Sequence, residues 1–154
     1  MREIVFFICL LSIIPINTKS QENLSEQNSS TEFRLKTPDK VIQSCNAFFK
    51  TLIEGKTEEA FNQILKDSPI KDKKDKVKEL IEQTRLANST YGLAMSYEQV
   101  SSEAATESLI KLQYITLHEK YPMRWIFTFY KSPKLGWIVV SLRFDDMSEF
   151  LFTE

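Results

Sequence analysis

Three residue types that build many enzyme sites are scarce in this chain. Its 154 residues include a single histidine, His118, only two cysteines, and three glycines, at Gly55, Gly92 and Gly136. Glycines so far apart cannot form a Gly-rich phosphate-binding loop. One histidine and two cysteines are too few for a typical metal cluster. We therefore expect neither a bound metal nor a cofactor.

An excess of charge of one sign is also missing. The chain carries 20 basic and 21 acidic residues, a formal net charge of −1. Leaving out residues 1–20, which hold Arg2, Lys19 and Glu3, gives 18 basic and 20 acidic residues, a net charge of −2. Such a balance offers no basic patch for the phosphates of nucleic acid or for an anionic membrane. We expect no nucleic-acid partner.

A long apolar run occurs only at the N-terminus. Ile4–Ile16 is interrupted only by Ser12 and Pro15, and small residues, Thr18 and Ser20, follow it. This is the pattern of a secretory signal peptide, here residues 1–20, with cleavage expected after Ser20. The run is shorter than the about 20 apolar residues of a membrane span. We expect a secreted or periplasmic protein without a membrane contact after cleavage; the alternative is an uncleaved anchor.

The exported chain then has one cysteine and a polar start. Cleavage would remove Cys9 and leave Cys45 alone, so that no intrachain disulfide could form. Residues 21–36 are polar and rich in Ser, Asn, Gln and Glu, which predicts a disordered tether. Asn23, Asn28 and Asn88 fit the glycosylation pattern, which has meaning only in a eukaryotic cell. Residues 37–154 have the length of a single domain.

The first half of this domain shows helical periodicity. Apolar residues recur at helical spacing in three segments bounded by capping and breaking residues. We expect helices from Thr37, as N-cap, to Gly55; from Thr57 to Ser68; and from Asp72 to Ala87. On the first helix, Cys45 lies among Val41, Phe48 and Phe49, so it reads as a core residue rather than a nucleophile.

The second half changes to a period of two, which is typical of strands. We expect strands at 91–98, 110–117, 123–131 and 137–144, a loop at 101–107, and a tight turn at Ser132–Gly136. Helices followed by short-looped antiparallel strands define an α+β fold, with three N-terminal helices packed on one face of a four-stranded sheet.

This order of elements, with the stretch FFKTLIEGKTEEAF at Phe48–Phe61 and a closing W-x-F-x-F-Y…G-W-x-V hairpin around Trp125 and Trp137, resembles the nuclear transport factor 2-like (cystatin-like α+β) superfamily. It looks most like the small exported members of unknown function. The resemblance implies a curved sheet that encloses a conical cavity with its helices. Some members are enzymes, such as ketosteroid isomerase and scytalone dehydratase; many are binding, delivery or dimerisation modules.

Several polar or aromatic residues are candidates to line such a cavity: Tyr97, Tyr114, His118, Trp125 and Arg124. The simpler interpretation makes the aromatic residues core and His118 a surface residue at a strand end, although it could also serve as a general base. Asp145 and Asp146 could form an acid/base or cation site, but we favour the interpretation that they are a hydrated strand terminus.

The two faces of the sheet can be assigned from the alternation. We expect the helices to cover the face with Leu93, Met95, Leu112, Trp125, Phe127, Phe129, Val140 and Leu142. The outer face would then carry Ile115, Leu117, Ile126, Thr128, Tyr130, Trp137 and Val139. Because a solvated face should be mostly polar, we expect a homodimer through Ile115, Ile126, Tyr130, Trp137 and Val139. The alternative is a monomer in which the tail at Phe150–Phe152 or the tether at residues 21–36 covers this face.

Together these patterns predict an exported small binding or interaction module, with an apolar cavity for a small ligand as one form it could take. The alternative function is a cofactor-free enzyme of the isomerase or dehydratase kind, which would use an acid/base residue in that cavity.

Overall fold

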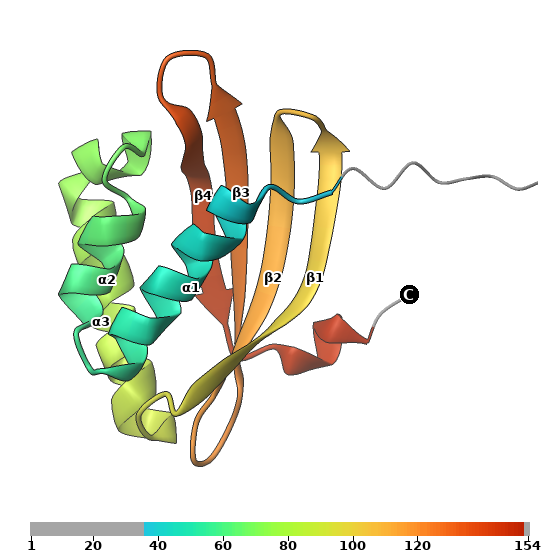
Figure 1. Cartoon of the computed structure of the whole chain (residues 1–154). Helices are drawn as coiled ribbons and strands as arrows, with labels where there is room; N and C mark the ends of the chain where they lie inside the picture. The colour runs from blue at the N-terminus through green and yellow to red at the C-terminus, as the bar shows by residue number, and fades with distance from the viewer. Residues whose placement is uncertain (1–35, 153–154) are drawn as a thin grey trace, which may run out of the picture. The chain divides into compact units, whose positions relative to one another are not determined.

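The computed structural model describes residues 36–152 and has the α+β fold expected (Figure 1). The expectations for residues 1–35, including the signal peptide, the tether, Asn23 and Asn28, lie outside the described residues. In chain order the elements are α1 (Asp39–Ile53), α2 (Thr57–Ile64), the 3₁₀ turn η1 (Pro69–Asp72), α3 (Lys74–Tyr91), β1 (Ser96–Thr106), β2 (Leu109–Leu117), β3 (Met123–Ser132), β4 (Gly136–Asp145) and the 3₁₀ turn η2 (Ser148–Leu151).

The α1 helix presents the predicted apolar stripe to the core. The stripe consists of five buried residues: Val41, Cys45, Phe48, Phe49 and Leu52. The start of the helix differs from the prediction, because Pro38 and not Thr37 occupies the N-cap position. The hydroxyl of Thr37 contacts that of Ser102 instead. The α2 helix ends at Ile64, earlier than the predicted stop at Ser68 and Pro69, and the Ser68 hydroxyl accepts a hydrogen bond from the Ile70 N–H.

The four strands form an antiparallel meander in the order β1-β2-β3-β4. Within it, Leu112 pairs with Phe127, and Phe127 pairs with Leu142. The predicted turn between β3 and β4 is confirmed: it ends at Gly136, whose φ of +73° is a conformation that favours glycine.

The predicted boundaries around the first strand are wrong. The α3 helix continues to Tyr91 and ends at Gly92, whose φ is +91°. Leu93 and Met95 lie in the connection to β1 and are 64% and 62% exposed, so they do not face the helices. The predicted loop at 101–107 is mostly part of β1. The small polar residues of this segment are tolerated because β1 is an edge strand that buries few side chains. An exposed edge strand can therefore have the same composition as a loop, which explains the wrong prediction.

The core lies between the helices and one face of the sheet. The α1 stripe packs against a row of large side chains on β2 and β3: Leu112, Tyr114, Trp125, Phe127 and Phe129. Phe48 makes edge-to-face ring contacts at 5.4 Å to Trp125 and 5.6 Å to Phe127. Contacts of this kind contribute about 0.5–1.5 kcal/mol each beyond burial of area, so the aromatic cluster fixes α1 on the sheet.

A bulge in β4 changes the predicted assignment of faces. Phe129 pairs with Val139 while Thr128 pairs with Ser141, so that Val140 is an extra residue in the strand. Residues before the bulge therefore reverse their alternation: Val139 is buried in the core and Trp137 packs against it. The assignment of Val139 and Trp137 to the outer face is wrong, and so is that of Val140 to the helix face.

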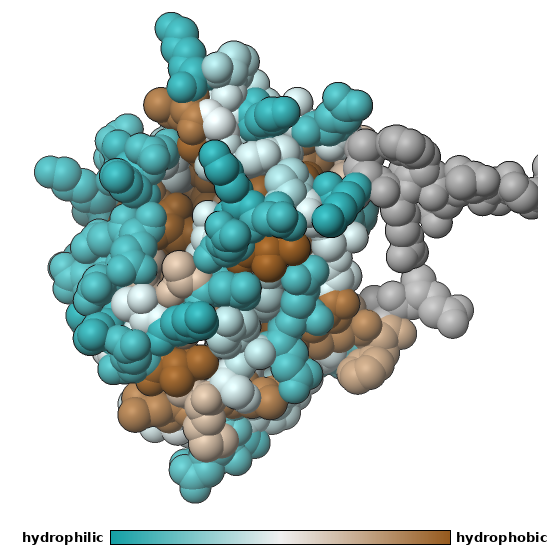
Figure 2. All heavy atoms as spheres, viewed as in Figure 1, coloured by the Kyte–Doolittle hydropathy of each residue, from teal (hydrophilic) through white to brown (hydrophobic). Residues whose placement is uncertain are grey.

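The visible surface over the helices is largely hydrophilic (Figure 2). The hydrophobic areas on this side appear as separate patches with hydrophilic side chains between them. This side therefore lacks a broad apolar area of the kind that marks an obligate interface.

Candidate functional site

The space where a ligand cavity was expected is filled with aromatic side chains. Tyr114 and Trp125 are only 1% and 2% exposed. Phe49 stacks on Tyr97 with ring centroids 4.9 Å apart and lies 5.0 Å from the ring of Tyr114. Three of the five cavity candidates, Tyr97, Tyr114 and Trp125, therefore pack with the core cluster instead of lining an open space.

Burial makes Cys45 and Tyr114, two ionisable residues of this cluster, unreactive. Burial in the core raises the pKa of the Cys45 thiol to about 12, an effect that a hydrogen bond with Tyr114 only partly offsets. Burial is also the main reason that the pKa of Tyr114 is raised. The Tyr114 hydroxyl donates to Oε1 of Gln99 at 3.3 Å. A thiol and a phenol that stay protonated are poor nucleophiles and bases.

His118, another of the cavity candidates, belongs to a series of hydrogen-bonded polar groups that begins at Trp125 of the aromatic cluster. Trp125 Nε1–H donates to Thr116 Oγ1 at 2.9 Å, and Thr116 Oγ1 lies 2.9 Å from His118 Nε2. His118 Nδ1 is 2.7 Å from the carbonyl oxygen of Gly92. A carbonyl can only accept, so Nδ1 carries the proton, and the Thr116 hydroxyl can then donate to Nε2.

In this arrangement each polar group of the hydrogen-bonded series has a partner, and the series connects the end of β2 to the end of α3. His118 therefore holds two elements together, and both of its ring nitrogens are occupied. A general base needs a nitrogen that can reach a substrate proton, and neither nitrogen of His118 is free to do so in this geometry.

Arg124 lies on the outer face of the sheet, away from the core. Its guanidinium donates Nε to Asp145 Oδ1 at 2.9 Å and Nη2 to Asp145 Oδ2 at 2.8 Å. The hydrogen bond with Asp145 is the main cause that raises the pKa of Arg124. The η2 turn brings the Phe150 ring to 5.3 Å from the guanidinium carbon. Arg124 and Asp145 thus hold the C-terminal turn on the sheet.

The carboxylate next in sequence is also engaged. Asp146 Oδ2 accepts a hydrogen bond from the Tyr91 hydroxyl at 2.6 Å, and this bond is the main cause of the raised pKa of Tyr91. Asp145 and Asp146 therefore make structural contacts to β3 and α3.

The residues predicted for a dimer interface are divided between the two sides of the sheet. Ile115, Ile126 and Tyr130 point to the outer face; Ile126 is only 6% exposed, whereas Tyr130 is 39% exposed. Trp137 and Val139 lie on the helix side because of the bulge.

An open groove on the helix side is the feature that the sequence did not predict. Its larger part is a hollow of about 660 Å³ between the first half of α1 and the β3–β4 hairpin. Its smaller part, of about 210 Å³, continues along the end of α2. Both parts share Ser44, Ala47 and Trp137. We call the two parts together the Trp137 groove.

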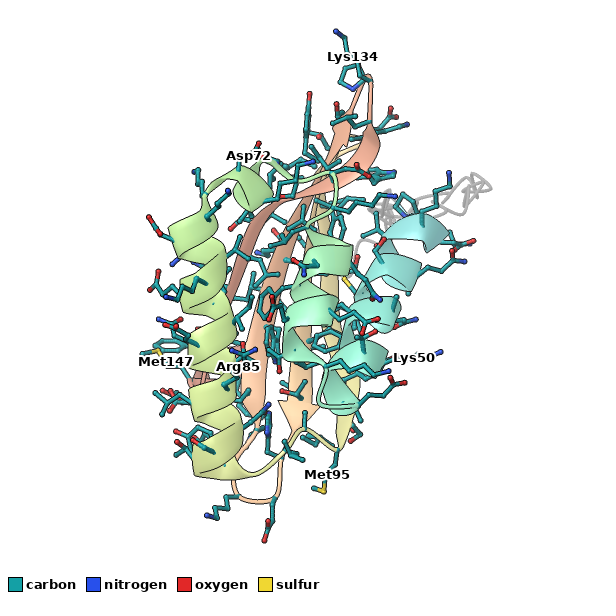
Figure 3. The ribbon with its side chains drawn as sticks, turned by 90° about the vertical axis from the view of Figure 1, so that its left-hand side faces the viewer. Lys50, Asp72, Arg85, Met95, Lys134 and Met147 are labelled. Carbon is teal, nitrogen blue, oxygen red and sulfur yellow. The ribbon has the colours of Figure 1, made fainter. Side chains whose placement is uncertain are left out.

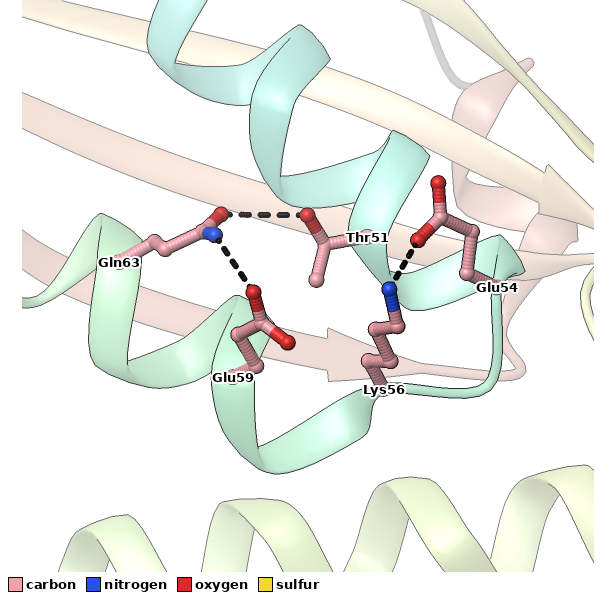
Figure 4. A network of polar contacts seen from close by, with 5 residues as sticks. All are labelled: Thr51, Glu54, Lys56, Glu59 and Gln63. Carbon is pink, nitrogen blue, oxygen red and sulfur yellow. Dashed lines mark hydrogen bonds and ion pairs between the residues drawn. The ribbon is translucent and has the colours of Figure 1, made fainter.

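A polar network outside the core fixes α2 as a wall of this groove (Figure 4). Thr51 of α1 donates to Gln63 Oε1 at 3.1 Å, and Gln63 Nε2 donates to Glu59 at 3.3 Å. In the loop between the helices, Lys56 pairs with Glu54 at 2.8 Å. These groups are exposed, so each contributes little to stability, but the bonds with Thr51 and Glu59 orient Gln63, which lines the groove.

The part of the chain that the structure describes has no group of three or more His, Cys, Asp or Glu residues placed to hold a metal ion. None of the helices in residues 36–152 has the length and apolar character to cross a membrane. Comparison of the chain with protein-family models, with curated proteins and with solved structures gives no match.

Proposed function

We propose that this protein is an exported interaction module that works through its surface and carries out no catalysis. The observation that supports this proposal most is the filled core: aromatic side chains occupy the region that a small substrate would need. In addition, Cys45, His118 and Asp145, which offered chemistry in the sequence, have structural partners or are buried.

We also propose that the chain is a member of the nuclear transport factor 2-like superfamily with a curved sheet. The order of helices and strands supports this membership. Support for curvature comes from the register shifts in the sheet, two between β1 and β2 and one between β3 and β4, because bulges bend the strands that contain them. In such a member, aromatic side chains would have replaced the cavity.

The two tryptophans of the exported chain provide a test of the filled core. Trp125 lies in the core and Trp137 in the groove, so their indole N–H signals in an NMR spectrum report separately on each place. We expect benzene or a fatty acid added to the mature protein to leave the Trp125 signal unchanged, because a close-packed core has no room for either.

A saturable shift of the Trp125 signal would instead show an accessible cavity and would favour the isomerase or dehydratase alternative. In that case His118→Ala or Asp145→Asn should abolish turnover of a small substrate while the fold survives. For an interaction module, both variants should keep the affinity for a partner nearly unchanged.

A further inference from the structure

The larger part of the Trp137 groove has an unusual balance of charge. Its lining consists of Lys40, Gln43, Ser44, Ala47, Lys131, Leu135, Gly136 and Trp137. Among the described residues, two lysines and no carboxylate line this hollow, although acidic and basic residues are nearly equal in number over the whole chain. Local charge of one sign attracts a partner of the opposite sign.

The side chains of the two lysines in the larger part of the groove have no partner among the described residues, whereas some other lysines of the protein do. Lys56, Lys76 and Lys111 each form an ion pair with a glutamate. Within residues 36–152, neither Lys40 nor Lys131 makes an ion pair or a side-chain hydrogen bond. They come from different elements, α1 and β3, and line the same hollow with their ammonium groups available.

The groove also offers an apolar contact. Trp137 packs against the core and lines both parts of the groove. The α1 residues beside it, Ser44 and Ala47, are small and exposed, and they leave room for a side chain from a partner. The smaller part of the groove adds the apolar side chain of Ile64, and its charged residues, Lys66 and Asp67, are of opposite sign.

The form of the groove favours a chain-like ligand. It runs from the β3–β4 hairpin past Trp137 to the end of α2, and its two parts are joined through shared residues. The hairpin extends beyond the helices, with Lys134 at its tip (Figure 3). A long open groove can take an extended peptide, whereas small molecules bind in more enclosed pockets.

We propose that the Trp137 groove binds an acidic peptide segment of a partner protein, with a bulky apolar side chain on the Trp137 indole and carboxylates near Lys40 and Lys131. This inference rests on the proposed function as an interaction module and assigns the class of partner.

The test is a titration of the mature protein with short fluorescent peptides. The probe alternates glutamate with leucine, and the controls alternate lysine with leucine and glutamate with serine. We expect the glutamate–leucine peptide to bind with a dissociation constant on the order of 10–100 µM, because the contact is small and transient. It should shift the Trp137 indole signal and leave that of Trp125 unchanged. Both controls should bind at least about tenfold more weakly, since each lacks one of the two contacts.

Charge reversal identifies the lysines. Lys40→Glu combined with Lys131→Glu should weaken binding of this peptide at least about tenfold, because attraction becomes repulsion at two places. The matched control is Lys50→Glu with Lys73→Glu, which changes the net charge equally. Lys50 lies on α1 away from the groove (Figure 3), and Lys73 precedes α3. This control should bind within about twofold of the unaltered protein.

The inference is overturned if the glutamate–leucine peptide fails to bind at millimolar concentration, if it binds without shifting the Trp137 signal, or if the two pairs of variants weaken binding equally. Each of these results would leave the filled core, and with it the proposed module, intact. A shift at Trp125 on addition of benzene or a fatty acid would contradict the module itself.

Discussion

Replacing Thr116 by Val should destabilise the protein although the two side chains have nearly the same volume. The hydroxyl of Thr116 is the hydrogen-bond acceptor for the Trp125 indole N–H, and both residues are buried. Valine keeps the β-branched shape that suits a strand. The substitution therefore removes one hydrogen-bonding group from the Trp125–Thr116–His118 chain and changes little else.

The loss of stability can be estimated from the Trp125 indole N–H, which Thr116→Val leaves without an acceptor. A buried donor without an acceptor costs about 1–3 kcal/mol, and Trp125 cannot turn towards water because rings of Phe48 and Phe127 pack around it. His118 also loses a partner, but it is only half-buried and can bind water instead. We expect a loss of about 2 kcal/mol in the free energy of unfolding. This corresponds to a fall of about 6–12 °C in melting temperature for a domain of this size.

Urea unfolding followed by far-UV circular dichroism measures this loss as a lower midpoint at an unchanged slope. Thr116→Ser is the matched control, because it keeps the hydroxyl and loses one methyl group, at a cost of about 0.8 kcal/mol. The Val variant should be the less stable of the two. If it is as stable as the Ser variant or the unaltered protein, the hydrogen-bonded chain does not hold α3 to β2 as described.

Three further predictions concern other parts of the molecule. Burial raises the pKa of Cys45 to about 12 in the folded protein, whereas the thiol of the unfolded chain ionises near pH 8.5. The free energy of unfolding should therefore not depend on this thiol below about pH 8.5, and it should fall by up to about 1.4 kcal/mol per pH unit as the pH rises towards 12. Urea unfolding at a series of pH values measures this slope, and Cys45→Ala should reduce it. Equal slopes for the two proteins would argue against a neutral buried thiol. The homodimer stays a prediction: light scattering should show a dimer at micromolar concentration that Tyr130→Glu dissociates, whereas a monomeric mature protein would exclude it. N-terminal sequencing of the exported protein should begin at Gln21, and a chain that still carries Ile4–Ile16 would show an anchor.

The elements that the sequence predicts well are those in which one periodicity dominates. The first helix has its large apolar residues mainly on one stripe, and Val41, Cys45, Phe48 and Phe49, which the sequence places on that stripe, are all buried. The β3 strand alternates between very large side chains, such as Trp125 and Phe127, and mostly smaller or charged ones, so the face with the larger side chains is the one that packs against the helices. In both cases the burial of large apolar groups outweighs every local preference.

The region around Tyr91 has no such dominant pattern. Tyr91, Leu93, Met95 and Tyr97 alternate in the sequence as a strand would, but only Tyr97 lies in one. Tyr91 completes the last turn of α3 and bonds to Asp146, and the positive φ of Gly92 then redirects the chain. Alternation cannot identify these roles, because both depend on contacts with residues far away in the sequence.

The candidate site depends on a single extra residue in β4. Trp137, Ile138, Val139 and Val140 are all apolar, so a pattern of alternation fits either face equally well over this stretch. In regular alternation, the face of Leu142 would also carry Ile138 and Val140. The bulge at Val140 places the larger Trp137 there with Val139 instead, and the Ser68 hydroxyl donates to the Val139 carbonyl. The run of four consecutive apolar residues before an alternating segment indicates that a bulge is possible. Which of the four side chains face the core, however, is decided by contacts with the helices and with Ser68. Without the bulge, Trp137 would be on the outer face, and the groove between α1 and the hairpin would lose the aromatic surface on which the proposed peptide contact depends.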